Sequence, residues 1–178
     1  VPIETRGSIG DYDWTTGKLT LWSSNQMPHF HRTMIAGHLG FPEHKIEVIA
    51  PRVGGGFGAK SCLFPEDLVV LLLSRELGRP VRWIEDRREN LLTASHAKQQ
   101  VNQMELGFSA DGKLVAIADT VIGDGGAYNS LPWTAVVEAM GASGNMTSVY
   151  DVPNLRDRHV TVATNKCPTG AYRGIGWT

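Results

Sequence analysis

A glycine-rich stretch, Val53–Ser61, holds the residues of this sequence whose types and spacing are best suited to chemistry. It reads Val-Gly-Gly-Gly-Phe-Gly-Ala-Lys-Ser, with four glycines within positions 54–58. Glycine lifts the steric limits on φ, so the backbone can run close to a ligand. An apolar run at 46–50 predicts a buried strand before the loop, and residues 65–77 predict a helix after it. Phosphates and dinucleotides often bind at such loops, because free N–H groups point outward there.

Two nucleotide motifs match this loop only in part. A P-loop needs Gly, four residues and then Gly-Lys-Ser/Thr, but Ala59 replaces the second glycine. Pro65 also falls where the first turns of a P-loop helix should already be formed. A dinucleotide fingerprint fits Gly54, Gly56 and Ala59, yet the predicted helix begins about five residues too late to meet a pyrophosphate.

Histidine and cysteine do not form a metal-binding pattern. His29 and His31 lie two apart in a predicted helix and face different sides, whereas His31 and His38 could share a face. Ordinary core or surface histidines are the favoured interpretation. Cys62 and Cys167 are isolated, which fits neither a disulfide framework nor a zinc site and is typical of a reducing compartment.

Strands and helices alternate in the first half of the chain, where they position the glycine loop. Each predicted helix ends at a glycine followed two residues later by a proline, which is a stop signal. Ser24 or Asn25 is the predicted cap of the first helix. The resulting order is a crossover β-α-β-α-β pattern, with elements at 17–22, 26–39, 45–50, 65–77 and 81–84.

The second half changes to a hairpin pattern. Residues 100–109 and 114–122 alternate around an Asp-Gly turn, which predicts two antiparallel strands. We expect Gly123–Gly126 to interrupt the second strand, residues 133–142 to form a helix, and residues 154–164 to form another strand. The predicted fold class is α+β: a mixed sheet with helices packed on it, with crossover units first and a β-hairpin plus helix second.

Composition places the chain among globular proteins. It has 178 residues, 42% hydrophobic and 20% charged, which suits one domain with an adequate core. The net charge is −1, so no broad basic surface indicates nucleic acid. No apolar run is long enough to span a bilayer. Any domain boundary would lie near Glu89–Gln99, but we do not divide the chain there.

Several motifs together resemble one family, the molybdenum hydroxylases. Gly54–Lys60 is similar to the Gly-Gly-Gly-Phe-Gly-Gly-Lys loop of xanthine dehydrogenase, aldehyde oxidase and the aerobic carbon monoxide dehydrogenase large subunit. The similarity covers nearly the whole chain in one order. It continues through Leu21–Gln26, Arg79–Trp83, Glu85–Arg87, Asp124–Tyr128 and Ala171–Gly174.

The resemblance implies a molybdenum–pterin cofactor, as molybdopterin or its cytosine dinucleotide. The family holds the metal through the dithiolene of the pterin, so no side chain is expected to ligate it. Gln26 falls where the family has a glutamine that hydrogen-bonds an oxo ligand, and an amide NH₂ can donate without adding charge. The residues implied to bind the cofactor are Gln26, Gly55, Gly56, Phe57, Gly58 and Arg173.

Three positions depart from particular members of the family, and the resemblance implies that they line the substrate pocket. Gly174 stands where carbon monoxide oxidisers have a cysteine that carries copper. Ser61 stands where purine oxidisers have an acidic residue, and Ile175 where they have a phenylalanine that stacks on the substrate. The expected substrate is therefore an aldehyde or an N-heterocycle.

The resemblance also implies what this chain lacks. The catalytic base of the family is a glutamate expected beyond Thr178, so no catalytic residue is expected within the chain. Residues 1–178 are therefore expected to be the first part of a cofactor-binding domain in a longer large subunit. Iron–sulfur (2Fe–2S) clusters and FAD are expected on partner domains or subunits. We expect a cytoplasmic oligomer that acts on a small molecule.

Two other functions stay open at this point. The loop Gly54–Lys60 could serve a nucleotide-binding module, with Lys60 attracting a phosphate. Alternatively, the chain could be a cofactor-free remnant or scaffold whose glycine loop only turns a corner.

Overall fold

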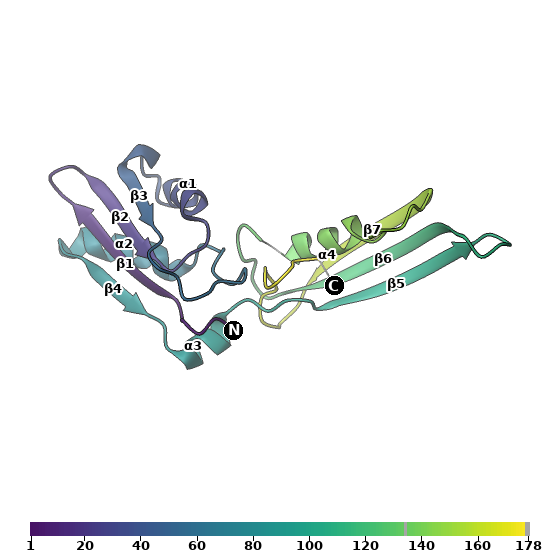
Figure 1. The fold of residues 1–178 in the computed structure, drawn as a ribbon. Helices are drawn as coiled ribbons and strands as arrows, with labels where there is room; N and C mark the ends of the chain where they lie inside the picture. The colour runs from purple at the N-terminus through teal and green to yellow at the C-terminus, as the bar shows by residue number, and fades with distance from the viewer. Residues whose placement is uncertain (134, 177–178) are drawn as a thin grey trace. The chain divides into compact units, whose positions relative to one another are not determined.

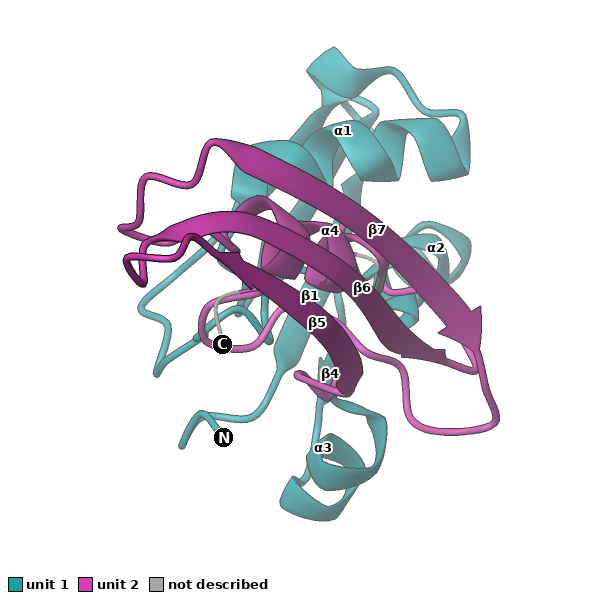
Figure 2. Cartoon of the chain, turned by 90° about the vertical axis from the view of Figure 1, so that its right-hand side faces the viewer, with its two compact units in different colours: residues 1–94 teal, residues 95–178 magenta. Residues whose placement is uncertain are grey.

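The computed structural model describes residues 1–133 and 135–176 of the chain. It forms two compact units, residues 1–94 and 95–178, coloured separately in Figure 2. The division falls within the segment 89–99, although the sequence had given no reason to divide the chain there. Each unit has its own sheet, and each is described by itself.

Unit 1 is a four-stranded mixed sheet in the order β3-β2-β1-β4 (Figure 1). Its strands are β1 (Gly7–Asp13), β2 (Lys18–Ser23), β3 (Ile46–Ile49) and β4 (Val81–Ile84). β1 pairs antiparallel with both β2 and β4, whereas β2 and β3 are parallel. A parallel pair needs a crossover connection, and the first helix provides it.

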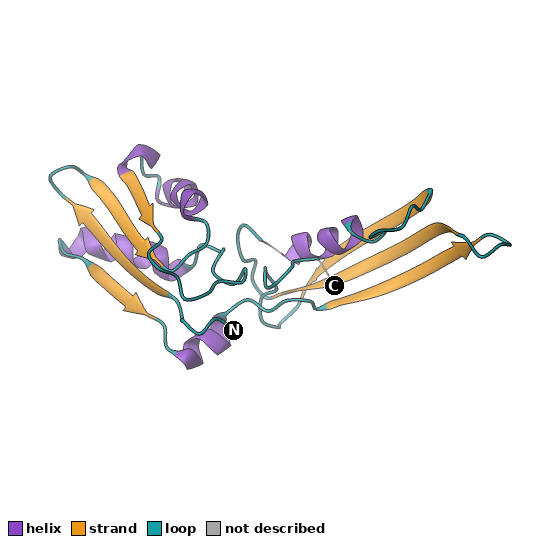
Figure 3. Ribbon diagram, in the orientation of Figure 1, coloured by secondary structure: helices purple, strands orange, loops and turns teal. Residues whose placement is uncertain are grey.

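The helices of unit 1 (Figure 3) are α1 (Pro28–Leu39), α2 (Pro65–Leu77) and α3 (Arg87–Thr93), with a short 3₁₀ turn at Glu43–Lys45. α1 packs against β3, and α2 packs across β1, β2 and β4. Their apolar residues meet on one face of the sheet. The core cluster consists of Leu19, Leu21, Ile35, Ile46, Val70 and Leu71. The predicted helix 65–77 is confirmed with the same bounds.

Strand β1 is an element that the apolar pattern did not predict. Its buried positions carry Ser8 and Gly10 instead of apolar side chains. A Cβ atom on Gly10 would lie 2.6 Å from the carbonyl oxygen of Val70, so the backbone of α2 lies directly on this strand. Small and polar residues therefore occupy the place where a pattern search expects large apolar ones.

Unit 2 is a three-stranded sheet in the order β5-β6-β7. The strands are β5 (Gln100–Phe108), β6 (Leu114–Gly126) and β7 (Asn154–Ala163). β5 and β6 form the predicted antiparallel hairpin, and β7 is parallel to β6. Helix α4 (Ala135–Gly144) connects β6 with β7 and packs on both. The α+β prediction is confirmed.

Two details of unit 2 differ from the sequence prediction. β6 continues through Gly123–Gly126, with a shift in its register to β7 between Asp124 and Gly126. A Cβ atom on Gly126 would lie 2.3 Å from the carbonyl oxygen of Cys167. The predicted helix 133–142 is observed as α4, beginning at Ala135, and residue 134 lies outside the described residues.

Candidate functional site

The glycine loop lies between β3 and α2, and no helix begins within it. α2 starts at Pro65, and the carboxylate of Asp67 in its first turn accepts a hydrogen bond from the Phe64 backbone N–H. Both nucleotide motifs need a helix N-terminus that opens at the loop and faces the phosphate. Here α2 begins after the loop, and the Asp67 carboxylate already accepts a hydrogen bond from the Phe64 N–H at the start of the helix. The geometry does not favour phosphate binding.

The loop backbone adopts conformations that most residues avoid. Gly55 and Gly58 have φ values of 97° and 91°, in the region that glycine enters without steric cost. Phe57 also has a positive φ, 53°, which is uncommon for a residue with a side chain. Such conformations persist only where surrounding contacts impose them, and they concentrate at functional sites. Among the contacts of this loop are hydrogen bonds to two side chains outside it, Gln26 and Glu4.

The first of these side chains is Gln26, whose amide is fixed against the loop. Its Oε1 accepts hydrogen bonds from the backbone N–H groups of Gly58, at 2.9 Å, and Lys60, at 3.2 Å. Its own backbone N–H donates to the Lys60 carbonyl at 3.0 Å. Because two donors meet Oε1, the amide orientation is determined and Nε2 is the other terminal atom. No acceptor for Nε2 lies among the described residues, and Gln26 is exposed.

The second is Glu4, which pairs with the lysine of the loop. Lys60 Nζ lies 2.6 Å from Glu4 Oε2, and the Lys60 side chain is only 2% exposed. Glu4 Oε2 also accepts a hydrogen bond from the Gly54 N–H at 2.8 Å. Burial alone would raise the pKa of Glu4, but its hydrogen bonds from Lys60 and Gly54 and the Lys60 charge lower it overall. The suggestion that Lys60 attracts a phosphate is not supported, because the ammonium is buried and paired.

Ser61 ends the loop and is held on both sides. Its hydroxyl donates to the Gly58 carbonyl, and its own carbonyl lies 3.2 Å from Nε2 of His31. A carbonyl can only accept, so Nε2 carries the proton, while the buried Nδ1 has no hydrogen-bond partner among the described residues. His31 is fully buried, and burial lowers its pKa despite opposing contributions from the Ser61 carbonyl and the Asp67 charge. A neutral His31 therefore holds the end of the loop.

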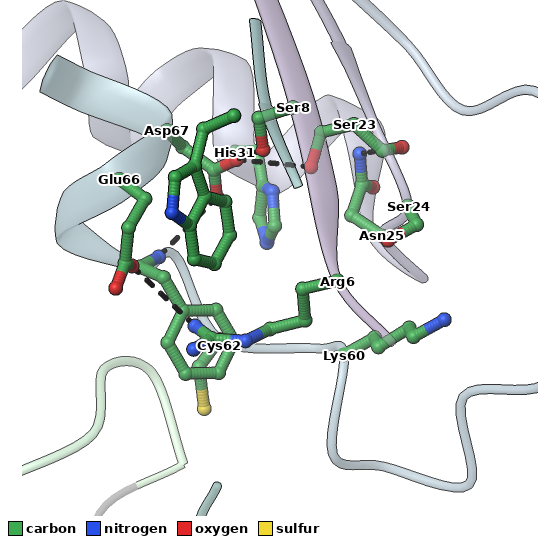
Figure 4. Close-up of a pocket in the computed structure, with 12 residues that line it drawn as sticks. Arg6, Ser8, Ser23, Ser24, Asn25, His31, Lys60, Cys62, Glu66 and Asp67 are labelled. Carbon is green, nitrogen blue, oxygen red and sulfur yellow. Dashed lines mark hydrogen bonds and ion pairs between the residues drawn. The ribbon is translucent and has the colours of Figure 1, made fainter. Parts of the chain in front are cut away.

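A small polar cavity lies behind the loop in unit 1 (Figure 4). Its volume is about 10 Å³, at the lower limit of the space that can hold one water molecule. Figure 4 shows Asp67 beside Ser8 and Ser23, whose hydroxyls both donate to its Oδ1. The guanidinium of Arg6 lies near Glu66. A cavity of this size cannot admit an organic substrate, so these residues support the loop from behind.

The remaining predicted residues lie in unit 2. Arg173 and Gly174 are exposed and have φ values of 45° and 74°, and Ile175 is half-buried. The next residue, Gly176, donates its N–H to Oε2 of Glu138, a buried carboxylate of α4, at 3.2 Å. The structure therefore brings Gln26, Gly55–Gly58 and Ser61 together in unit 1, and it places the arginine motif in unit 2.

Sequence reasoning missed Glu4 and the role of His31. Neither residue belongs to a motif, and the partner of Glu4 lies 56 positions away. Among the described residues, no group of three or more His, Cys, Asp or Glu side chains could hold a metal ion. None of the described helices is both long and apolar enough to cross a membrane.

Comparison with known proteins places these features in context. The sequence profile of the family described as "Molybdopterin cofactor-binding domain" matches residues 1–178. The chain is 45% identical, over 99% of its length, to the nicotine 6-hydroxylase large subunit of Paenarthrobacter nicotinovorans, and it covers 22% of that protein. It is 40% identical, over 97% of its length, to the carbon monoxide dehydrogenase large chain of Afipia carboxidovorans, and covers 21% of it.

A solved structure shows the same fold. The quinoline 2-oxidoreductase of Pseudomonas putida 86 aligns with a TM-score of 0.93 and 57% identity, over 99% of this chain and 22% of that one. The chain therefore spans about a fifth of the length of these relatives.

Proposed function

This chain belongs to the family of molybdopterin cofactor-binding domains, and on that premise we propose that it forms the first part of the catalytic region of a molybdenum hydroxylase large subunit. The proposed reaction hydroxylates an N-heterocycle with oxygen derived from water. Nicotine and quinoline, named in two of the relatives, both contain a nitrogen heterocycle, which supports this class over an aldehyde.

The observation that carries the proposal is the fixed amide of Gln26. Two loop N–H groups hold Oε1, so the two hydrogens of Nε2 are left to donate to a bound group. An oxo group is such an acceptor, and a neutral amide can donate to it without adding charge. Phe57 and Gly58 have positive φ values, and the loop backbone at Gly58 lies against the Gln26 amide. The residues present therefore fit the cofactor.

When bound, the molybdenum–pterin cofactor supplies the redox chemistry of the hydroxylation. The chain binds and orients it: Gln26 donates hydrogen bonds, and the loop at 55–58 approaches it without side chains at three of four positions. Arg173 offers a fixed positive charge toward the pterin, and Ser61, Gly174 and Ile175 contribute to the substrate pocket.

The proposal extends to the assembled protein. A glutamate from later polypeptide acts as the base, and 2Fe–2S clusters and FAD on partner domains or subunits receive the electrons. The proposed protein is a cytoplasmic oligomer, and its pterin is molybdopterin or the cytosine dinucleotide form. The names "large subunit" and "large chain" of the relatives support the presence of further subunits, and the other parts of this arrangement rest on the family resemblance.

The test is the molybdenum and pterin content of the full reading-frame product, made in a host that builds the cofactor. Gln26→Glu keeps one oxygen for the Gly58 and Lys60 N–H groups and replaces the Nε2 donor with a second acceptor. We expect N-heterocycle turnover with an artificial electron acceptor to fall about 10- to 100-fold, the value of a lost hydrogen bond to a charged group.

Gln103→Glu is the matched control, because Gln103 is exposed on β5 and the same charge change there should leave turnover unchanged. A folded wild-type product without molybdenum or pterin would contradict the proposal. ATP and NAD titration would then test the nucleotide-binding alternative.

A further inference from the structure

One carboxylate joins the two ends of the glycine loop. Glu4 Oε2 binds the backbone N–H of Gly54 and the ammonium of Lys60, at 2.8 Å and 2.6 Å. Glu4 also donates its backbone N–H to the Gly54 carbonyl at 3.4 Å. We infer that Glu4 and Lys60 are positioning residues that hold the loop closed in the geometry that presents Gln26 to the cofactor. The inference rests on the proposed function.

The backbone of Lys60 connects the Glu4–Lys60 pair to Gln26. The Lys60 N–H donates to Gln26 Oε1, and the Lys60 carbonyl accepts from the Gln26 N–H at 3.0 Å. The side chain of the same residue is held by Glu4. A displacement of Lys60 therefore moves two of the contacts that fix Gln26. Glu4 therefore acts on the Gln26 amide through Lys60 and does not hydrogen-bond to Gln26 itself.

Burial makes the two members of the pair unequal. The Lys60 side chain is 2% exposed and that of Glu4 is 39% exposed. After loss of its partner, Glu4 can be hydrated where it stands, whereas Lys60 would remain a buried, unpaired charge. The loop must then open to bring the ammonium to water. We therefore expect removal of Glu4 to disturb the loop more than removal of Lys60.

Hydrogen exchange of the full reading-frame product tests the inference without relying on activity. In Lys60→Met, the amides of residues 58 and 60 should exchange about tenfold faster, because the loop opens more often. Glu4→Gln should accelerate them by a further factor of about ten. Molybdenum retained after gel filtration should fall in the same order, and Lys60→Arg should restore both readouts toward the wild type.

The control is another lysine–glutamate pair in the same unit. Lys18 Nζ lies 2.5 Å from Glu47 Oε2, but both side chains are nearly half exposed. Exposed pairs contribute little, so Lys18→Met and Glu47→Gln should change loop exchange less than about twofold. Amides of α2 report whether each variant is folded, and Lys60→Met decides the matter if Glu4→Gln does not fold.

The possible failures are distinguishable. Loop exchange in folded Lys60→Met that is no faster than in the Lys18→Met control would overturn the inference. So would faster exchange with unchanged molybdenum retention, because the pair would then not position the cofactor-binding groups. A wild-type product that lacks molybdenum contradicts the proposed function instead, and the exchange comparison still decides whether Glu4 and Lys60 close the loop.

Discussion

Gly56→Ala is the sharpest test of how the loop holds Gln26. A Cβ atom at this position would lie 2.4 Å from both Cδ and Oε1 of Gln26, a separation that no real pair of atoms maintains. Gly56 is not among the residues with positive φ, so alanine can adopt its backbone conformation. The substitution therefore acts through the contact with Gln26 and leaves the rest of the loop unstrained.

The magnitude follows from what must move. The clash involves the end of a flexible side chain, so the amide rotates away and the loop backbone stays in place. The rotation gives up the hydrogen bonds from Gly58 and Lys60 to Oε1. At about 0.5–1.5 kcal/mol for each bond, the free energy of unfolding should fall by about 1–3 kcal/mol. The donor Nε2 also leaves its position, so we expect cofactor content to fall with it.

The assay is thermal unfolding and molybdenum content of the full reading-frame product as a double-mutant cycle. In a Gln26→Ala background there is no amide to displace, so adding Gly56→Ala should cost less than about 0.5 kcal/mol. Equal costs of Gly56→Ala in both backgrounds would refute the reasoning, because the alanine would then be acting on something other than Gln26.

Two further predictions concern the fold that supports the loop. Gly10→Ala should destabilise unit 1 by about 1–3 kcal/mol, because the backbone of Val70 must move to make room for the new Cβ atom. Gly37→Ala should stabilise unit 1 by about 1 kcal/mol, because Gly37 is exposed on α1 and a Cβ atom there would meet no atom within 4 Å. Thermal unfolding that ranks the two variants otherwise would contradict the packing argument. Glu85→Gln should cost up to about 3 kcal/mol, because it removes the buried carboxylate 2.5 Å from the Arg6 guanidinium and leaves the partly exposed Glu66, at 3.4 Å, as the remaining charged partner among the described residues. Burial raises the pKa of Glu85, but its hydrogen bonds from Arg6 lower this pKa overall from its usual value of 4.5. The stabilisation by Glu85 is therefore present above pH 4.5 and is lost as the pH falls below 4.5. The acid dependence of unfolding should become weaker in Glu85→Gln, which acid titration of the unfolding free energy measures.

Sequence patterns predicted the elements that bury apolar residues in the usual way. α2, β4 and the end of α1 follow from periodicity and from glycine–proline stop signals, and the structure confirms them. The predicted cap of α1 at Ser24 or Asn25 was wrong, because the helix begins at Pro28 and its N-cap position is Met27. β1 escaped prediction because its buried face holds Ser8 and Gly10, which leave room for the backbone of α2. Hydrophobicity cannot indicate a strand whose packing depends on the absence of side chains.

The site was predictable to the extent that it lies in a local motif. The glycine loop and Gln26 were identified from the sequence, and the structure brings them into contact. Glu4 was not identifiable, because one carboxylate near the start of the chain carries no pattern, and its value arises only when the fold brings it to Lys60. The positive φ of Phe57 was equally invisible, since phenylalanine is not a residue that indicates such a backbone.

The glycines of this loop make room for side chains of the protein itself, and this distinguishes the loop from a phosphate-binding loop. A Cβ atom on Gly54 would lie 2.6 Å from Glu4, and one on Gly56 would lie 2.4 Å from Gln26. The N–H groups of Gly54, Gly58 and Lys60 donate to these same two side chains, so they are not available to an anion. A phosphate loop keeps such donors for its ligand. Here the loop uses them to fix the Gln26 amide through Oε1, and the proposed function assigns the other end of that amide, Nε2, to the cofactor.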